Sequence, residues 1–221
     1  MTDQSDDGRG ERAVHETYDR IATHFSKTRE YAWPEVEEFL DGRTATVAVD
    51  VGCGNGRHTE LLADCADHAV GLDASTGLLR EASERATERG FDASLVAGDA
   101  ARLPLRDDAT DLAVYVATLH HLRSRSARVA SLDEIARVLT PDGAALVSVW
   151  STEHDTFDRD HGFDTTVDWT LPGGETVPRF YHVYDPQEFR DDLDASALAV
   201  QDAFVSSGNC YAVVHSEGKL P

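Results

Sequence analysis

The chain has 221 residues, and its 20 lysine and arginine side chains face 41 aspartate and glutamate side chains, a formal net charge of −21. A hydrophobic fraction of 41% is enough for a packed core in one domain. No apolar run reaches the roughly 18 residues of a membrane-spanning helix, and three cysteines without a Cys-x-x-Cys pair argue against a disulfide framework or a zinc site.

The amino-terminal part is predicted to be a short tail followed by two helices. Residues 1–10 are polar and acidic, lack the apolar stretch of a signal peptide, and indicate a disordered tail before a single domain over residues 11–221. Apolar residues recur at three- and four-residue spacing from Val14 to Phe25, which predicts an amphipathic helix. Pro34 marks the start of a second, short helix.

Five apolar runs bounded by turn residues then predict buried strands at 45–51, 69–73, 94–97, 111–117 and 144–149. The helices between them include one that Ser75 caps and Gly90 closes, and one over residues 125–139. This alternation predicts an α/β fold, a doubly wound parallel sheet with helices on both faces. Residues 152–178 break the pattern and are predicted to be an inserted loop on the substrate side, before strand-like runs at 180–184, 197–205 and 211–214.

The most specific local motif is Val49-Asp-Val-Gly-Cys-Gly-Asn-Gly56, in which a strand enters a glycine-rich turn and then a helix. Glycine suits a turn against which a ligand lies, because side chains would block the ligand. The third glycine comes one residue earlier than in the Gly-x-Gly-x-x-Gly dinucleotide fingerprint, which weakens a nicotinamide interpretation.

Two aspartates follow the next strands and are expected at the same crevice. Asp73 ends the second strand, where its carboxylate can accept two ribose hydroxyls. Asp99 follows the third strand, where it can accept from an adenine amino group. The alternative is that both aspartates cap helices or turns.

This constellation resembles class I S-adenosylmethionine-dependent methyltransferases over residues 45–150. The resemblance implies S-adenosylmethionine as the cofactor and a Rossmann-like, seven-stranded methyltransferase sheet. It also implies the cofactor-binding residues, which are Tyr18, Asp50, Gly52, Gly54, Gly56, Asp73, Asp99 and Ala100.

The flanking segments resemble the methyltransferases of tRNA wobble 5-carboxymethyluridine nearly from end to end. The segments are Val14–Arg29 with Trp33-Pro34, Leu119-His-His-Leu122, Val149-Trp150, 164–172, Arg179-Phe-Tyr-His-Val-Tyr184, and Asn209 with Tyr211. The resemblance implies transfer of a methyl group to the carboxylate of 5-carboxymethyluridine at the wobble position of tRNA.

The implied acceptor is already ionised at pH 7, so its methylation needs no general base. It needs one carboxylate oxygen aligned with the methyl group and a cation on the other oxygen. Arg29 and Arg179 are the candidate cations, while His120, His121 and His182, as well as His24, could donate hydrogen bonds or stack on the base. The alternatives are an ion pair with one of the 41 acidic residues for each arginine and a packed structural role for each histidine.

Two partner surfaces are predicted. Arg123, Arg125 and Arg128 follow the histidine pair and, with the two candidate cations, could form a cationic island for the phosphates of the tRNA anticodon loop; a solvated helix start is the alternative. The resemblance also implies a heterodimer with a small zinc-binding activator protein. The apolar strand at 93–97, which contains no lysine or proline, is the predicted docking edge, and Leu78 and Leu79 could extend it.

The charge composition indicates where the protein works. Only Lys27 and Lys219 are lysines, and acid-rich, lysine-poor chains suit a halophilic cytoplasm, where molar salt shortens the Debye length to about 3 Å. An ordinary acidic protein is the alternative. Two further functions remain open: a small-molecule methyltransferase on the same fold, and a non-catalytic scaffold.

Overall fold

A computed structural model describes the backbone of residues 7–216 and the side chains of residues 14–216. The helices are α1 (Asp7–Ser26), α2 (Pro34–Leu40), α3 (Arg57–Cys65), α4 (Thr76–Arg89), α5 (Arg125–Val138) and α6 (Pro186–Asp194), with a short 3₁₀ turn η1 (Leu119–His121). The strands are β1 (Ala45–Val51), β2 (Ala66–Asp73), β3 (Ser94–Ala97), β4 (Thr110–Val116), β5 (Leu139–Trp150), β6 (Phe163–Thr170), β7 (Thr176–Val183), β8 (Leu198–Ser206) and β9 (Asn209–Ser216).

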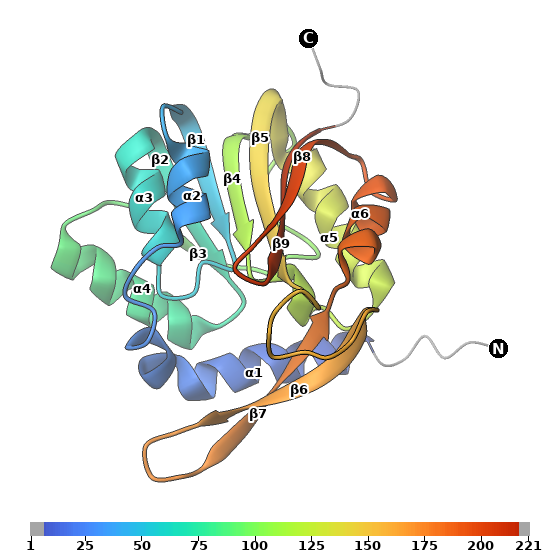
Figure 1. Cartoon of the computed structure of the whole chain (residues 1–221). Coiled ribbons are helices and arrows are strands. Elements are labelled where there is room, and N and C mark those ends of the chain that lie inside the picture. The colour runs from blue at the N-terminus through green and yellow to red at the C-terminus, as the bar shows by residue number, and fades with distance from the viewer. Residues whose placement is uncertain (1–6, 217–221) are drawn as a thin grey trace.

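Seven of these strands form one twisted sheet in the order β3-β2-β1-β4-β5-β9-β8 (Figure 1). The first five strands in this order, β3, β2, β1, β4 and β5, run parallel to one another. Strand β9 is antiparallel to both β5 and β8. The predicted doubly wound α/β fold is therefore confirmed. Strand β3 lies at one edge of the sheet, as expected.

Alternation along the strands builds a separate core on each face of the sheet. In β4, Leu112, Val114 and Val116 pack with α2 and α3, whereas Ala113 and Tyr115 pack with α5 and α6. Both sets are buried, and for this reason the parallel strands read as continuous apolar runs in the sequence.

Local capping explains where the helices begin and end. The Ser75 hydroxyl accepts from the Leu78 amide at the start of α4, and Gly90 ends that helix with φ +75°. Both predictions are confirmed. Helix α6 was not predicted, although Asp185 caps it and Pro186 occupies its first turn, the usual start signals. Helix α5 ends at Val138 and β5 begins at the next residue, Leu139. Pro141 therefore lies inside β5 and not in a turn between the helix and the strand.

Two parts of the chain differ from the sequence-based expectation. The predicted inserted loop over 152–178 is wrong from Phe163 onward, where β6 and β7 pair as an antiparallel two-stranded sheet from Phe163↔Val183 to Thr170↔Thr176. Cross-strand pairing satisfies the backbone groups of this mostly polar segment, and Val177 of β7 is buried. Helix α1 begins at Asp7, inside the expected tail, and residues 1–6 lie outside the described part of the chain.

Helix α1 lies across the end of the sheet where the parallel strands finish, and the β6–β7 hairpin runs along its other side (Figure 1). Its buried residues Tyr18, Ile21 and Ala22 form one cluster with Leu78 of α4 and Val177 of β7. The helix thus covers the carboxyl ends of the parallel strands. Within residues 7–216, no helix is both long and apolar enough to cross a lipid bilayer.

Candidate functional site

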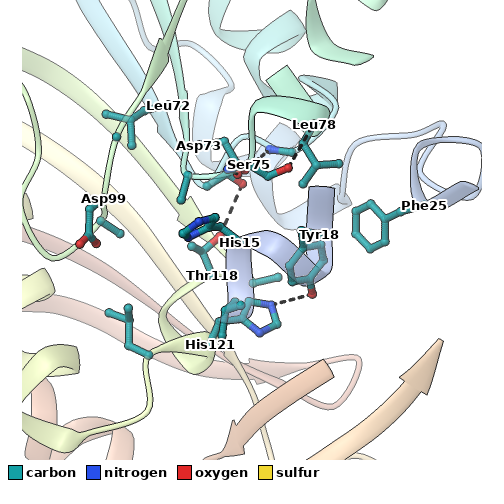
Figure 2. A pocket seen from close by; sticks show the side chains of 18 residues that line it. His15, Tyr18, Phe25, Leu72, Asp73, Ser75, Leu78, Asp99, Thr118 and His121 are labelled. Carbon is teal, nitrogen blue, oxygen red and sulfur yellow. Dashed lines mark hydrogen bonds between the residues drawn. The ribbon is translucent and has the colours of Figure 1, made fainter. Parts of the chain in front are cut away.

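A cavity of about 430 Å³ opens at the carboxyl ends of the parallel strands, beneath α1. Its walls come from the glycine turn after β1, the end of β2, the segment after β3, the turn around η1, and α1, whose Tyr18 and Phe25 stand opposite Asp99 (Figure 2). The predicted residues Tyr18, Gly52, Gly54, Asp73, Asp99 and Ala100 all line it.

The glycine turn keeps this cavity open. Gly52 has φ +72°, and a Cβ there would stand 2.1 Å from the Thr118 hydroxyl oxygen. Gly54 has φ +57°, and a Cβ there would meet no atom within 4 Å, so the Gly54 backbone faces open space. The first glycine is thus required by packing, and the second leaves room for a ligand against the backbone.

Asp73 is held at the cavity wall by two backbone amides. One carboxylate oxygen accepts from the Gly54 amide at 2.8 Å and the other from the Ser75 amide at 2.8 Å. Burial raises the pKa of Asp73, and the hydrogen bonds from Ser75 and Gly54 oppose that rise. Each carboxylate oxygen keeps one lone pair, so the group can still accept two hydroxyl donors.

Asp99 is exposed, and one of its oxygens accepts from the Ala101 amide at 2.9 Å, closing a tight turn. Its carboxylate lies at the opposite side of the cavity from Tyr18 (Figure 2). The turn-capping role considered for this residue is therefore present, and it does not take Asp99 out of the cavity.

Two predicted cofactor residues lie outside the cavities described here. Asp50 is 1% exposed, and its carboxylate accepts from the Thr59 hydroxyl at 2.7 Å, behind the glycine turn. Gly56 has φ +78° and stands against α4, where an added Cβ would lie 3.2 Å from the Ala82 methyl group. The structure gives Gly56 a packing role, because α3 and α4 approach each other there.

A second cavity of about 350 Å³ adjoins the first, since Tyr18, Gly52, Gly54, Ala117 and His121 line both. We call it the acceptor cavity. Aromatic side chains dominate its walls together with three arginines, and no aspartate or glutamate lines it; the arginines are Arg29, Arg57 and Arg179. In a chain of net charge −21, this cavity is locally cationic.

Arg179 is the central cation of the acceptor cavity. The side chain is 7% exposed, one terminal nitrogen donates to the Tyr181 hydroxyl at 2.6 Å, and its Nε–H has no hydrogen-bond partner. The guanidinium also lies 4.8 Å from the centre of the Trp169 ring. Neither Arg179 nor Arg29 forms an ion pair with a carboxylate of the described residues.

Arg29 follows α1 and lies over the Phe25 ring, 4.7 Å from its centre. Burial lowers the pKa of Arg29 from its usual value, and the neighbouring Arg179 contributes in the same direction. The two candidate cations thus line one cavity and repel each other, an arrangement that an anion would stabilise.

The histidine pair is held in neutral form by burial. His121 Nδ1 lies 2.9 Å from the Phe180 carbonyl oxygen and so donates to it, which leaves Nε2 to accept from the Tyr18 hydroxyl at 3.0 Å. Burial lowers the pKa of His121 to about 4. His120 Nδ1 accepts from the Trp150 amide at 2.9 Å, and burial holds its pKa well below the usual range.

His182 is not brought into either cavity. Its two ring nitrogens lie 2.7 Å from an Asp164 oxygen and 2.8 Å from a Glu188 oxygen, so it ties the hairpin to α6. His24 lines neither of these two cavities, and its Nδ1 accepts from the Trp169 indole at 3.0 Å. The contacts of His182 and His24 thus fit a packed structural role, the alternative to substrate binding.

The predicted cationic island after the histidine pair is not formed as expected. Arg125 lies 2.6 Å from an Asp192 oxygen, and the buried Arg128 lies 3.5 Å from Glu188 and 3.6 Å from Asp192. Only Arg123 of the three makes no ion pair among the described residues. Helix α6, missed in the sequence, supplies the two carboxylates.

Sequence reasoning missed several lining residues. His15, Thr118 and Arg57 line the cavities, and Ala117 adopts φ +55°, a strained conformation for a non-glycine residue that often marks a functional site. An alternation pattern carries no signal for such a turn. No group of three or more histidine, cysteine or acidic side chains is arranged to hold a metal ion within the described range.

Comparison with known proteins agrees with this geometry. Residues 49–147 match the methyltransferase domain family. A tRNA (carboxymethyluridine(34)-5-O)-methyltransferase of Schizosaccharomyces pombe is 32% identical over 193 residues, covering 85% of this chain and 79% of the relative. One of Arabidopsis thaliana is 37% identical over 143 residues, covering 64% of this chain but 33% of the relative, so the chain spans about a third of that protein.

Solved structures share the fold at low sequence identity. The Burkholderia thailandensis 1,6-didemethyltoxoflavin-N1-methyltransferase, solved with 1,6-didemethyltoxoflavin and S-adenosylhomocysteine, superposes with a TM-score of 0.74 at 19% identity and covers 98% of this chain and 93% of its own. The DhpI–SAH complex gives a TM-score of 0.73 at 19% identity, covering 94% and 97%. These similarities establish the architecture.

Proposed function

We infer the function from the premise that this chain belongs to the tRNA carboxymethyluridine methyltransferase family. We propose that it transfers a methyl group from S-adenosylmethionine to the carboxylate of 5-carboxymethyluridine at the wobble position of a tRNA. The observation that carries the proposal is Arg179, a buried arginine without a carboxylate partner in a cavity that adjoins the cofactor-sized one.

The residues of the larger cavity fit S-adenosylmethionine. Asp73 has two free lone pairs for the ribose hydroxyls, and Gly54 faces open space that any side chain would fill. Asp99 and Ala100, at the far side, would hold the adenine. The cofactor supplies an electrophilic methyl group on a sulfonium, whose positive charge suits the acidic wall.

The acceptor cavity fits a carboxylated pyrimidine. Its aromatic walls, which include Trp150 and Tyr181, can stack on the base, and Arg179 presents a planar donor set that matches a carboxylate. We assign Arg179 to the carboxylate oxygen that is not methylated, because a tight ion pair on the other oxygen would lower its nucleophilicity. The neutral His120 keeps an Nε2–H that can donate to the base.

The test is labelled methyl transfer to tRNA that carries 5-carboxymethyluridine, followed by nucleoside mass spectrometry. Wild-type protein should form the methyl ester, and Arg179→Ala should lose most of the transfer while cofactor affinity stays nearly intact. Arg179→Lys is the matched control, which keeps the charge but not the planar fork, and should retain part of the activity. Transfer to small carboxylic acids but to no RNA would favour the small-molecule alternative, and cofactor binding without any transfer would favour the scaffold.

We further propose that the protein works in the cytoplasm as a heterodimer with a small zinc-binding activator, whose chain adds to the β3 edge. Support comes from the sheet order, which leaves β3 with a single neighbour, and from its apolar, half-buried Leu95 and Val96. The expectation that Leu78 extends this edge is wrong, because Leu78 is buried against α1. A proline in residues 94–97 should abolish co-purification; a monomer fully active alone would contradict the proposal.

A further inference from the structure

A third cavity of about 240 Å³ lies on the other side of Arg179, between α1, the segment before α5 and the β6–β7 hairpin. It touches the two larger cavities because Tyr18 lines all three. Among the described residues that line it, none carries a carboxylate and two are arginines, Arg123 and Arg179. We call it the flanking cavity.

Arg123 is the first cation of the flanking cavity. Its guanidinium lies over the Phe180 ring, 4.3 Å from the ring centre, and its backbone carbonyl accepts from the buried Arg128 at 3.4 Å. The residue is therefore held from both ends without any carboxylate. Arg125, two positions later, differs because Asp192 neutralises it at 2.6 Å.

Arg179 is the second cation, and it belongs to the flanking and acceptor cavities at once. One of its terminal nitrogens is used by Tyr181, while the buried Nε–H is unpartnered. A buried donor without a partner costs free energy unless a ligand supplies an acceptor. Two arginines from different elements therefore converge on a cavity to which no acidic residue of the described part of the chain contributes.

The acidic side chains of the neighbouring strand β6 do not line the flanking cavity. Asp164 and Asp168 share the exposed face of β6 with Thr166, but neither lines the flanking cavity. Asp164 is engaged by His182 at 2.7 Å. The charged side chains that residues 14–216 present inside the cavity are thus the two arginines.

We propose that the flanking cavity binds a phosphodiester group of the tRNA strand, next to the nucleotide whose base enters the acceptor cavity. This inference rests on the proposed function, which places a nucleotide in the adjoining cavity. A strand with its base there must pass a backbone phosphate close to Arg179, and guanidinium groups bind phosphate oxygens in a fixed geometry. Arg123 supplies the affinity for the strand, whereas the acceptor carboxylate remains with Arg179.

The test couples one protein change to one RNA change. An anticodon stem-loop containing 5-carboxymethyluridine is prepared with normal linkages and with a neutral methylphosphonate on either side of the target nucleotide. Its affinity for wild type and for Arg123→Gln is measured by fluorescence anisotropy at several KCl concentrations. Arg123→Gln should weaken binding of normal RNA about three- to tenfold and lower the slope of log K against log salt by about 1.

On one side of the target nucleotide, the neutral linkage should weaken RNA binding by wild type by a similar factor. The same linkage should weaken RNA binding by Arg123→Gln by less than about a further twofold. The matched control is Arg43→Gln, because Arg43 also stacks on a phenylalanine, Phe39 at 4.6 Å, but lines a cavity at the opposite end of the sheet. It should leave RNA binding unchanged.

The inference is overturned if Arg123→Gln binds like wild type, or if both neutral linkages weaken the two proteins equally. Failure of the proposed function looks different. Wild type would then bind the stem-loop without methylating it, and the anisotropy cycle would still decide whether Arg123 contacts a phosphate.

Discussion

Asp73 carries the first prediction at the residue scale. Its carboxylate links the glycine turn to the start of α4 and keeps two lone pairs for hydroxyl donors. Asp73→Ala should lower cofactor affinity by about 1.5–3 kcal/mol, the range for hydrogen bonds to a charged group. Isothermal titration calorimetry with S-adenosylmethionine measures the loss.

Two variants separate the role of Asp73 in binding from its role in the turn. Asp73→Asn keeps an oxygen for one backbone amide and should lose less affinity than Asp73→Ala. Asp99→Ala removes an exposed carboxylate and should also have the smaller effect. Equal affinity of wild type and Asp73→Ala would contradict the assignment.

Asp50 carries a pH prediction. Burial raises its pKa to about 7, although the Thr59 hydroxyl opposes the shift. Between about pH 4 and pH 7 the folded chain therefore holds a proton that the unfolded chain has released, and stability falls as the pH rises through this window. Below about pH 4 both states are protonated and the group costs nothing.

Asp50→Asn cannot ionise, and its amide oxygen can still accept from Thr59. The free energy of unfolding of the variant, relative to wild type, should rise between about pH 4 and pH 7.5, by up to about 4 kcal/mol. Urea unfolding at the two pH values measures the difference. A constant difference would show that Asp50 has an ordinary pKa in the folded protein.

The β6–β7 hairpin carries the prediction at the element scale. It is separate from the main sheet, and Trp169 joins it to α1 by an indole hydrogen bond to His24 at 3.0 Å and a ring contact with Phe25 at 5.5 Å. The same ring lies against Arg179. The position of the candidate cation thus depends on how the hairpin docks on α1.

Trp169→Ala should raise KM for tRNA more than it changes cofactor affinity, because the hairpin lines the acceptor side. Amide hydrogen exchange should speed up over residues 163–183 while β4 and β5 remain protected. Trp169→Phe keeps an aromatic ring without the indole donor. Its KM for tRNA and its exchange rates should lie between those of wild type and Trp169→Ala. Faster exchange throughout the sheet would contradict independent docking of the hairpin.

The whole molecule carries a charge prediction. A net charge of −21 on 221 residues destabilises the compact state by self-repulsion, which salt screens. The melting temperature should rise as KCl is increased toward molar concentrations. A melting temperature that is independent of KCl, or that rises equally with sorbitol at matched osmolality, would favour an ordinary acidic protein.

The sequence by itself predicted the five parallel strands β1–β5, the helices between them and a candidate site at the carboxyl ends of these strands, but neither the β6–β7 hairpin nor α6. Those features depend on local signals: apolar runs for buried strands, Ser75 and Gly90 for the ends of α4, and glycines where backbone must approach a ligand. The end-to-end family resemblance added Arg29 and Arg179, and the structure brings both to one cavity.

Only the tertiary structure decided which charged groups are available. Arg123, Arg125 and Arg128 look alike in the sequence, but α6 places Asp192 and Glu188 beside two of them and leaves the first unpaired among the described residues. His182 is likewise engaged by the carboxylates of Asp164 and Glu188, whereas His121 is engaged by the Tyr18 hydroxyl, 103 residues away in the chain. The free energy of a charged or hydrogen-bonding group depends on partners that folding brings close, and no local pattern encodes their distance.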